Sequence, residues 1–253
     1  MVMTITGPAG ELYVDDAGSG SGVPILFVHS FAGASGHWKA QLAHLRPRRR
    51  AIAMDARGHG HSDKPTGGDY GVPSLGEDIA AVADALELKR FVLVGHSLGG
   101  AAAAAYVGKH PRRVAGLVLA GAPGKADPAQ AKQVMASLHA DYDKVMAGYW
   151  ASLVGNAQPE VRETLEAGMR SIGREASLAI IGAIFEFDPL PALTAYDGPK
   201  LIIDTAHGDG PTALHNQLPD VKRKVIEGTS HWPHMDRPQE FNRLLDEFLA
   251  WIA

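Results

Sequence analysis

The stretch VLVGHSLGGAAAAA, residues 92–105, decides the fold and raises the question of function. A β-branched apolar run, typical of a buried strand, leads into GHSLG (95–99), and helix-forming alanines follow. G-x-S-x-G between a strand and a helix is the pattern of a nucleophile elbow, in which glycines let neighbouring backbone pass close to the serine. The simpler alternative is a glycine-rich turn whose serine only caps the helix. Ser97 is therefore a candidate nucleophile, provided that a base, an acid and an oxyanion site lie elsewhere in the chain.

The composition indicates a globular protein, and the length lies within the range of a single α/β domain. The chain has 253 residues, 45% of them hydrophobic and 21% charged, which is enough for a substantial core. The formal net charge of −4 gives no electrostatic case for a nucleic-acid partner or an anionic membrane. The one basic cluster, RPRRR (46–50), is predicted to be a solvated loop.

Several chemistries and locations are disfavoured by what the sequence lacks. There is no cysteine, which excludes disulfides, thiolate metal sites and cysteine nucleophiles. The opening MVMTITGPAGELYV lacks the basic and apolar regions of a signal peptide, and no apolar run approaches the ~18 residues of a membrane span. We therefore predict a soluble, cytoplasmic protein with no membrane partner, and assembly as a homodimer stays open.

Short apolar runs without polar alternation recur along the chain, as expected for a parallel sheet covered on both faces. They lie at residues 23–30, 50–58, 90–97, 114–123, 199–205 and 222–228. Helical patterns alternate with them at 36–45, 74–86, 98–110 and 238–251, and GELYVDDAGSG (10–20) adds an antiparallel hairpin strand at the front. This order predicts an α/β fold with a mostly parallel central sheet flanked by helices.

The interval 124–197 interrupts this alternation, because it has helical patterns and no strand-like run. We predict a helical cap inserted late in the sheet at 124–197, with 1–123 and 198–253 forming the core. An insertion after the carboxyl end of a strand tends to cover the ligand crevice. Apolar cap residues could therefore line a substrate pocket, although ordinary helix packing explains them equally well. These candidates are Met135, Leu138, Tyr142, Met146, Tyr149, Trp150 and Phe185.

A serine nucleophile needs a base at the same edge of the sheet. His231 follows the last strand-like run after a short Gly-Thr-Ser loop, which places it at the carboxyl edge together with Ser97. His234 lies three residues further on, after Pro233, and is the weaker candidate. A metal pair of these two histidines would lack further ligands, so we predict no metal and no cofactor.

The third member of a triad orients the imidazole and stabilises its charged form. The chain order Ser…Asp…His indicates the loop after residues 199–205. Asp209, which has glycine on both sides, is preferred to Asp204, which abuts the strand. Asp127, after the preceding strand, is a further alternative and could instead cap a helix before Pro128.

An oxyanion hole needs two backbone donors. The N–H of Leu98 follows the nucleophile, and the N–H of Phe31 lies in the small-residue loop after residues 23–30. Neighbouring side chains are predicted to line the substrate pocket together with Tyr149 and Trp150; they are Ser30, His96 and Trp232. The loop MDARGHGHSDKP (54–65) is predicted to be a hydrogen-bonded scaffold beside the site rather than a metal site.

Four motifs together resemble the α/β-hydrolase fold superfamily, in its capped esterase, lactonase and perhydrolase-like branch. FVHSFAG resembles the oxyanion segment, DARGHGHSDKP the D-x-R-G-x-G-x-S loop, VGHSLGG the elbow and GTSHWPHMDRPQEF the terminal histidine segment. The resemblance implies Ser97 as nucleophile, His231 as base, and Phe31 with Leu98 as oxyanion donors. Two positions depart from it. The acid at Asp209 stands one place later than usual, and Ser30 stands where the family usually has glycine.

These residues predict a serine esterase that cleaves a small to medium carboxylic ester through an acyl-enzyme. Lactone opening, C–C bond hydrolysis and cofactor-free perhydrolysis use the same triad and remain alternatives. A ligand-binding receptor with a vestigial triad is the alternative that is not an enzyme. Motifs of this kind define the fold much better than the substrate.

Overall fold

One mixed sheet organises the part of the chain that the structure describes. The structure is a computed structural model, and it describes residues 1–65, 67–205 and 209–252. Eight strands of these residues pair in the order β1-β2-β4-β3-β5-β6-β7-β8, with the strands from β3 to β8 parallel and β1 and β2 antiparallel. The strands are β1 (Val2–Gly7), β2 (Gly10–Ala17), β3 (Ile25–Val28), β4 (Ala51–Met54), β5 (Phe91–His96), β6 (Val114–Ala120), β7 (Lys200–Asp204) and β8 (Lys222–Val225).

The central strands are apolar at successive positions because both faces of the sheet are covered. Every residue of β3, β5 and β6 is buried. Neighbouring residues point to opposite faces, so that Leu26 and Leu93 join one core cluster while Phe27 and Val94 join the other. The predicted α/β fold with a mostly parallel sheet is confirmed.

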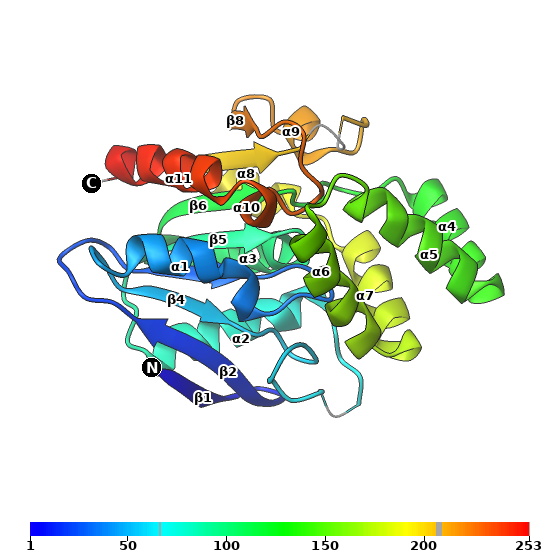
Figure 1. Ribbon diagram of the computed structural model, residues 1–253, viewed down its shortest axis with the longest axis horizontal. Coiled ribbons are helices and arrows are strands. Elements are labelled where there is room, and N and C mark those ends of the chain that lie inside the picture. The colour runs from blue at the N-terminus through cyan, green and yellow to red at the C-terminus, as the bar shows by residue number, and fades with distance from the viewer. Residues whose placement is uncertain (66, 206–208, 253) are drawn as a thin grey trace.

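Helices pack on both faces of this sheet (Figure 1). On one face, α1 and α11 contribute Leu45, Phe241 and Leu245 to the core around Phe27. On the other face lie α2 and α3. Apart from the four helices described below, the helices are α1 (Lys39–Leu45), α2 (Val72–Ala85), α3 (Leu98–Lys109), α8 (Leu190–Ala195), α9 (Leu214–Gln217), α10 (Pro233–Asp236) and α11 (Pro238–Ile252), with short 3-10 turns η1 (Ser35–Trp38) and η2 (Pro111–Arg113), in the part of the chain that the structure describes.

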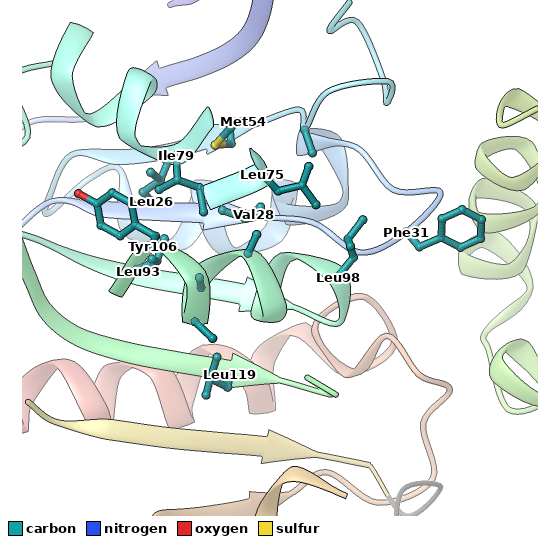
Figure 2. Packing of buried hydrophobic residues seen from close by; sticks show 14 of the residues in the cluster. Leu26, Val28, Phe31, Met54, Leu75, Ile79, Leu93, Leu98, Tyr106 and Leu119 are labelled. Atoms are coloured by element: carbon teal, nitrogen blue, oxygen red, sulfur yellow. The ribbon is translucent and has the colours of Figure 1, made fainter. Parts of the chain in front are cut away.

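The core under α2 and α3 supports the elbow directly. Figure 2 shows Leu75 and Ile79 of α2 and Tyr106 of α3 in one buried cluster with the strand residues Leu26 and Leu93. Burying one such side chain stabilises the fold by about 1.5–3 kcal/mol. The first turn of α3, which carries Leu98, is therefore fixed by packing along the whole helix.

Four helices follow β6 and precede α8 and β7. They are α4 (Pro128–Ala140), α5 (Tyr142–Val154), α6 (Pro159–Ser171) and α7 (Arg174–Glu186). In Figure 1 they lie beyond the carboxyl ends of the parallel strands, with α4 and α5 furthest from the sheet. The helical content expected for 124–197 is thus observed, while its treatment as a separate cap domain stays a prediction.

Two details differ from the sequence-based expectations. The arginines of RPRRR are not simply solvated: Arg46 and Arg50 pair with Asp15 and Asp16 of β2 at 2.8 and 2.6 Å. The amino-terminal strand β1 was not expected, and it completes the hairpin with β2. None of the described helices is long and apolar enough to cross a bilayer.

Candidate active site

Ser97 lies in the turn between β5 and α3 in a strained backbone conformation. Its φ of +52° and ψ of −114° lie in a region of backbone conformation that residues other than glycine rarely occupy. A Cβ on Gly95 would lie 2.3 Å from the carbonyl oxygen of Gly99, and a Cβ on Gly99 would lie 2.4 Å from that of Val28. The tight turn therefore requires both glycines of the motif, and the strain falls on the serine between them.

The candidate oxyanion loop is a second strained turn beside the elbow. Ala32 has a φ of +55°, and Gly99 packs against the carbonyl oxygens that begin this loop. Phe31 extends from the loop toward the inserted helices, whereas Leu98 begins α3 (Figure 2). The first N–H groups of a helix have no acceptor within the helix, and Leu98, the first residue of α3, directly follows the serine, so the positive end of the helix dipole lies beside Ser97. Non-glycine residues held at positive φ are typical of functional sites.

His231 lies in the loop between β8 and α10 and lines the same cavity as Ser97. Its main chain is held on two sides. The N–H donates to the carbonyl of Leu153 at 2.9 Å, and the carbonyl accepts from Nε2 of His96 at 2.8 Å. The structure thus brings Ser97 and His231 to one cavity, and their catalytic roles stay a prediction.

His234, the alternative base, points into the core. It is completely buried and stacks on Trp38 with ring centroids 4.1 Å apart. Burial lowers the pKa of His234 well below its usual 6.5, and nearby His37 and His231 add to that shift. Its ring is therefore a neutral packing element and does not line the cavity.

The three candidate acids lie in different environments. Asp127 caps α4, because its carboxylate accepts from the N–H of Gln130 at 2.8 Å. Asp204 ends β7, is only 8% exposed and lines the cavity. Asp209 has a side chain that is 67% exposed, and it is not among the cavity-lining residues.

Asp204 and Asp209 share two cationic or potentially cationic partners. Arg223 donates from Nε to Asp204 Oδ2 at 2.9 Å and from a terminal nitrogen to Asp209 Oδ1 at 2.7 Å. His215 lies 2.8 Å from Asp204 Oδ2 through Nδ1 and 3.2 Å from Asp209 Oδ1 through Nε2. Burial raises the pKa of Asp204, although Arg223 and His215 oppose that shift. All of these Asp204 contacts use Oδ2.

The cavity that contains Ser97 and His231 has a volume of about 530 Å³. Its apolar wall comes from the inserted helices, through Tyr149, Leu153, Ile184 and Phe185. Its polar wall includes residues that the sequence analysis did not identify, since no motif marks them: Gln130, Thr205, Thr212 and His215. A cavity lined by both apolar and polar side chains suits a small organic molecule that carries groups of both kinds.

The five predicted pocket residues separate into two groups. Tyr149 lines the cavity and is 46% exposed. The others lie in the core behind the lining, where Trp150 packs edge-on against Trp232 with ring centroids 5.3 Å apart. Ser30 accepts from Trp232 Nε1 at 3.0 Å, and His96 is completely buried. These positions do not contact the cavity.

The loop after β4 forms a buried scaffold, as the sequence predicted. Asp55 accepts from the N–H of Ser35 at 2.5 Å and from that of His61 at 2.8 Å. His29 donates from Nδ1 to the carbonyl of Ser30 at 2.7 Å and accepts at Nε2 from the N–H of Ala56 at 2.9 Å. Burial lowers the pKa of His29 to about 3, which suits this neutral tautomer. Within the described residues, no group of three or more His, Asp, Glu or Cys side chains could hold a metal ion.

The fold, together with the strained turn at Ser97, indicates the family to which the protein belongs. The family model for the alpha/beta hydrolase fold matches residues 23–155, just over half of the chain, and the chain belongs to this family.

Solved and curated relatives carry several activities. Est816, an N-acyl homoserine lactone degrading enzyme, has a TM-score of 0.84 and 28% identity over 97% of this chain and 100% of its own. A thermophilic esterase from Thermogutta terrifontis has a TM-score of 0.82 and 26% identity, and the match covers 100% of this chain and 99% of that protein. A 2-hydroxy-6-oxo-2,4-heptadienoate hydrolase from Pseudomonas putida is 42% identical over 117 residues, which cover 45% of this chain and 42% of that protein. The chain is thus similar to hydrolases of different substrates.

Proposed function

We propose that the protein is a serine hydrolase that cleaves a small to medium carboxylic ester through an acyl-enzyme. The observation that carries this proposal is that Ser97, in a strained elbow, and His231 line one cavity. His231 takes the proton of Ser97 as the hydroxyl attacks the ester carbonyl, and the N–H groups of Leu98 and Phe31 stabilise the oxyanion. The alcohol leaves with the proton from His231. Water, activated by the same imidazole, then releases the carboxylic acid.

For the acid of the triad, the observations support Asp204 over Asp209. Asp204 is buried and shares the cavity wall with His231, whereas Asp209 is mostly exposed and outside that wall. The Oδ1 atom of Asp204, which lies outside its contacts with Arg223 and His215, is the oxygen that would accept from the imidazole. An aspartate in this role keeps the imidazole in the correct tautomer and stabilises its protonated form.

The cavity supports a substrate with an apolar acyl arm and a polar end. Leu153, Ile184 and Phe185 would contact the arm, and Thr205, Thr212 and His215 would face the polar end. Likeness to a lactone-degrading enzyme at 28% identity makes a lactone the second candidate, because ring opening uses the same attack on an ester carbonyl.

Turnover of p-nitrophenyl esters by the wild type, Ser97→Ala and His231→Ala tests the proposal. Loss of one triad member in a serine hydrolase typically lowers kcat by about 10⁴–10⁶-fold. We expect hydrolysis by the wild type and losses of that order in both variants, with folding intact by circular dichroism. A wild type that binds esters without turnover would instead support the receptor alternative.

A further inference from the structure

Two hydrogen bonds join side chains that lie directly beside the candidate catalytic groups. Nε2 of His96 donates to the main-chain carbonyl of His231 at 2.8 Å. Nε1 of Trp232 donates to Oγ of Ser30 at 3.0 Å. Ser30, His96 and Trp232 are at most 1% exposed, and none of them lines the cavity. Their effect on a reaction in the cavity must therefore pass through their neighbours.

Those neighbours are the groups that acyl transfer has to align. His96 directly precedes Ser97, Ser30 directly precedes Phe31, and Trp232 directly follows His231. The first bond thus ties the histidine loop to the elbow, and the second ties the histidine loop to the oxyanion loop. His96 and Trp232 also contact each other edge-on, with ring centroids 5.8 Å apart, so that the two bonds form one connected unit.

We propose that Ser30, His96 and Trp232 are positioning residues, which hold the His231 loop in register with the nucleophile and the oxyanion donors. This inference rests on the proposed hydrolase function. A displacement of about 1 Å in such a site can lower the rate about a hundredfold, because attack and proton transfer both depend on alignment. The three residues therefore affect the rate of reaction more than the binding of substrate.

The chemistry of the two hydrogen bonds fixes which group donates and which group accepts. A carbonyl oxygen only accepts, so His96 carries its proton on Nε2. An indole nitrogen only donates, so Ser30 acts as the acceptor for Trp232. Burial lowers the pKa of His96 well below 6.5, with His234 and His231 adding to the shift, and its ring is neutral. Glycine at position 30 would leave the buried indole N–H without this acceptor. The serine that departs from the family pattern thus has a defined partner.

Steady-state kinetics with p-nitrophenyl butyrate tests the proposal. We expect Ser30→Ala and His96→Met to lower kcat about tenfold to a hundredfold while KM stays within about twofold. His96→Gln, which matches Met in length and restores a donor near the position of Nε2, should recover most of the lost rate. A change in KM without a change in kcat would overturn the proposal and would indicate that these residues shape the substrate pocket instead. Equal losses in His96→Met and His96→Gln would also overturn it, in favour of packing alone.

Tyr196→Phe is the matched control for loss of a buried hydrogen bond. Tyr196 donates to the carbonyl of Val114 at 3.0 Å, at the opposite end of β6 from the cavity. This variant should lose stability by thermal denaturation while its kcat is unchanged. If Tyr196→Phe lowers kcat as much as Ser30→Ala does, general destabilisation explains both, and the positioning role is contradicted.

Nuclear magnetic resonance of the wild type and Ser30→Ala separates this inference from the proposed function. The wild type should show the Nε2–H tautomer of His96 and a slowly exchanging indole N–H of Trp232, and Ser30→Ala should speed that exchange. The Nδ1–H tautomer, or fast indole exchange in the wild type, would overturn the inference even if Ser97 is the nucleophile. A wild type that shows the predicted spectra but neither hydrolyses esters nor is labelled at Ser97 would overturn the proposed function instead.

Discussion

The main-chain N–H of His231 donates to the carbonyl oxygen of Leu153 at 2.9 Å, which joins the loop of the candidate base to the inserted helix α5. Leu153 also lines the cavity, together with Ile184 and Phe185 of α7. The inserted helices therefore both shape the cavity and hold the histidine loop. In the proposed hydrolase, this arrangement would link substrate selection to the alignment of the site.

The apolar wall predicts a change in acyl preference. Phe185→Ala removes a large side chain from the cavity lining and lengthens the space for an acyl arm. We expect the ratio of kcat/KM for p-nitrophenyl octanoate over acetate to rise about tenfold, since even one extra or missing methylene in an apolar pocket is worth about 1–3 kcal/mol. Trp251→Ala, at an exposed position of α11, should leave the ratio unchanged. An unchanged ratio in Phe185→Ala would remove this residue from the substrate wall.

The geometry of the turn at Ser97 predicts that no side chain fits at position 99. A Cβ there would lie 2.4 and 2.6 Å from the carbonyl oxygens of Val28 and His29, which are backbone atoms and cannot move aside easily. Gly99→Ala should lower the free energy of unfolding by about 3 kcal/mol. Gly148→Ala, in α5, meets no atom within 4 Å and should stabilise the protein by about 0.5–1 kcal/mol. Urea unfolding compares the two, and a Gly99→Ala protein as stable as the wild type would contradict the turn described.

The acid assignment predicts an asymmetry between two neighbouring aspartates. Asp204→Asn should lower kcat by about 10²–10⁴-fold, because an amide cannot hold the imidazole in its active tautomer. Asp209→Asn should change kcat by less than about threefold, since an exposed ion pair contributes little. Steady-state kinetics of both variants with p-nitrophenyl butyrate tests which aspartate is the acid. The opposite pattern would return the role to Asp209.

Buried neutral histidines predict a loss of stability in acid. Burial lowers the pKa of His29 to about 3 and that of His37 to about 4, from 6.5. The unfolded chain then binds more protons than the folded chain, so this stability is complete above pH 6.5 and falls as the pH drops toward the folded values. Between pH 6.5 and its pKa in the folded protein, each histidine lowers the folding equilibrium constant about tenfold for each unit by which the pH falls.

Urea unfolding from about pH 7.5 to about pH 4.5 measures this slope. His29→Gln can still accept from the N–H of Ala56 through its amide oxygen but cannot titrate. The free energy of unfolding of this variant should fall less steeply below pH 6.5 than that of the wild type. Identical slopes would show that His29 does not contribute.

Local sequence patterns predicted most of the fold and the placement of Ser97 and His231 at one edge of the sheet. The uninterrupted apolar runs of β3, β5 and β6 follow directly from burial on both faces of the sheet. The spacing of Gly95 and Gly99 around Ser97 reflects contacts within a few residues of the turn. The position of His231 follows from topology, because parallel strands end at the same edge.

Contacts between distant segments could not be predicted in this way. Ser30, His96 and Trp232 adjoin site residues, and a neighbour of a site residue can point into the cavity or into the core. Their directions depend on partners far away in the chain, such as Trp232, which stands 202 positions after its partner Ser30. The environments of Asp204 and Asp209 depend likewise on Arg223, which β8 brings beside both of them.

Labelling with a fluorophosphonate probe, followed by peptide mass spectrometry, tests the central claim most directly. Such a probe forms a covalent bond with an activated serine that sits beside an oxyanion hole. We predict one modified residue, Ser97, with labelling abolished in Ser97→Ala and strongly slowed in His231→Ala. Modification of a different residue, or an unmodified wild type, would contradict the assignment of Ser97 as the nucleophile.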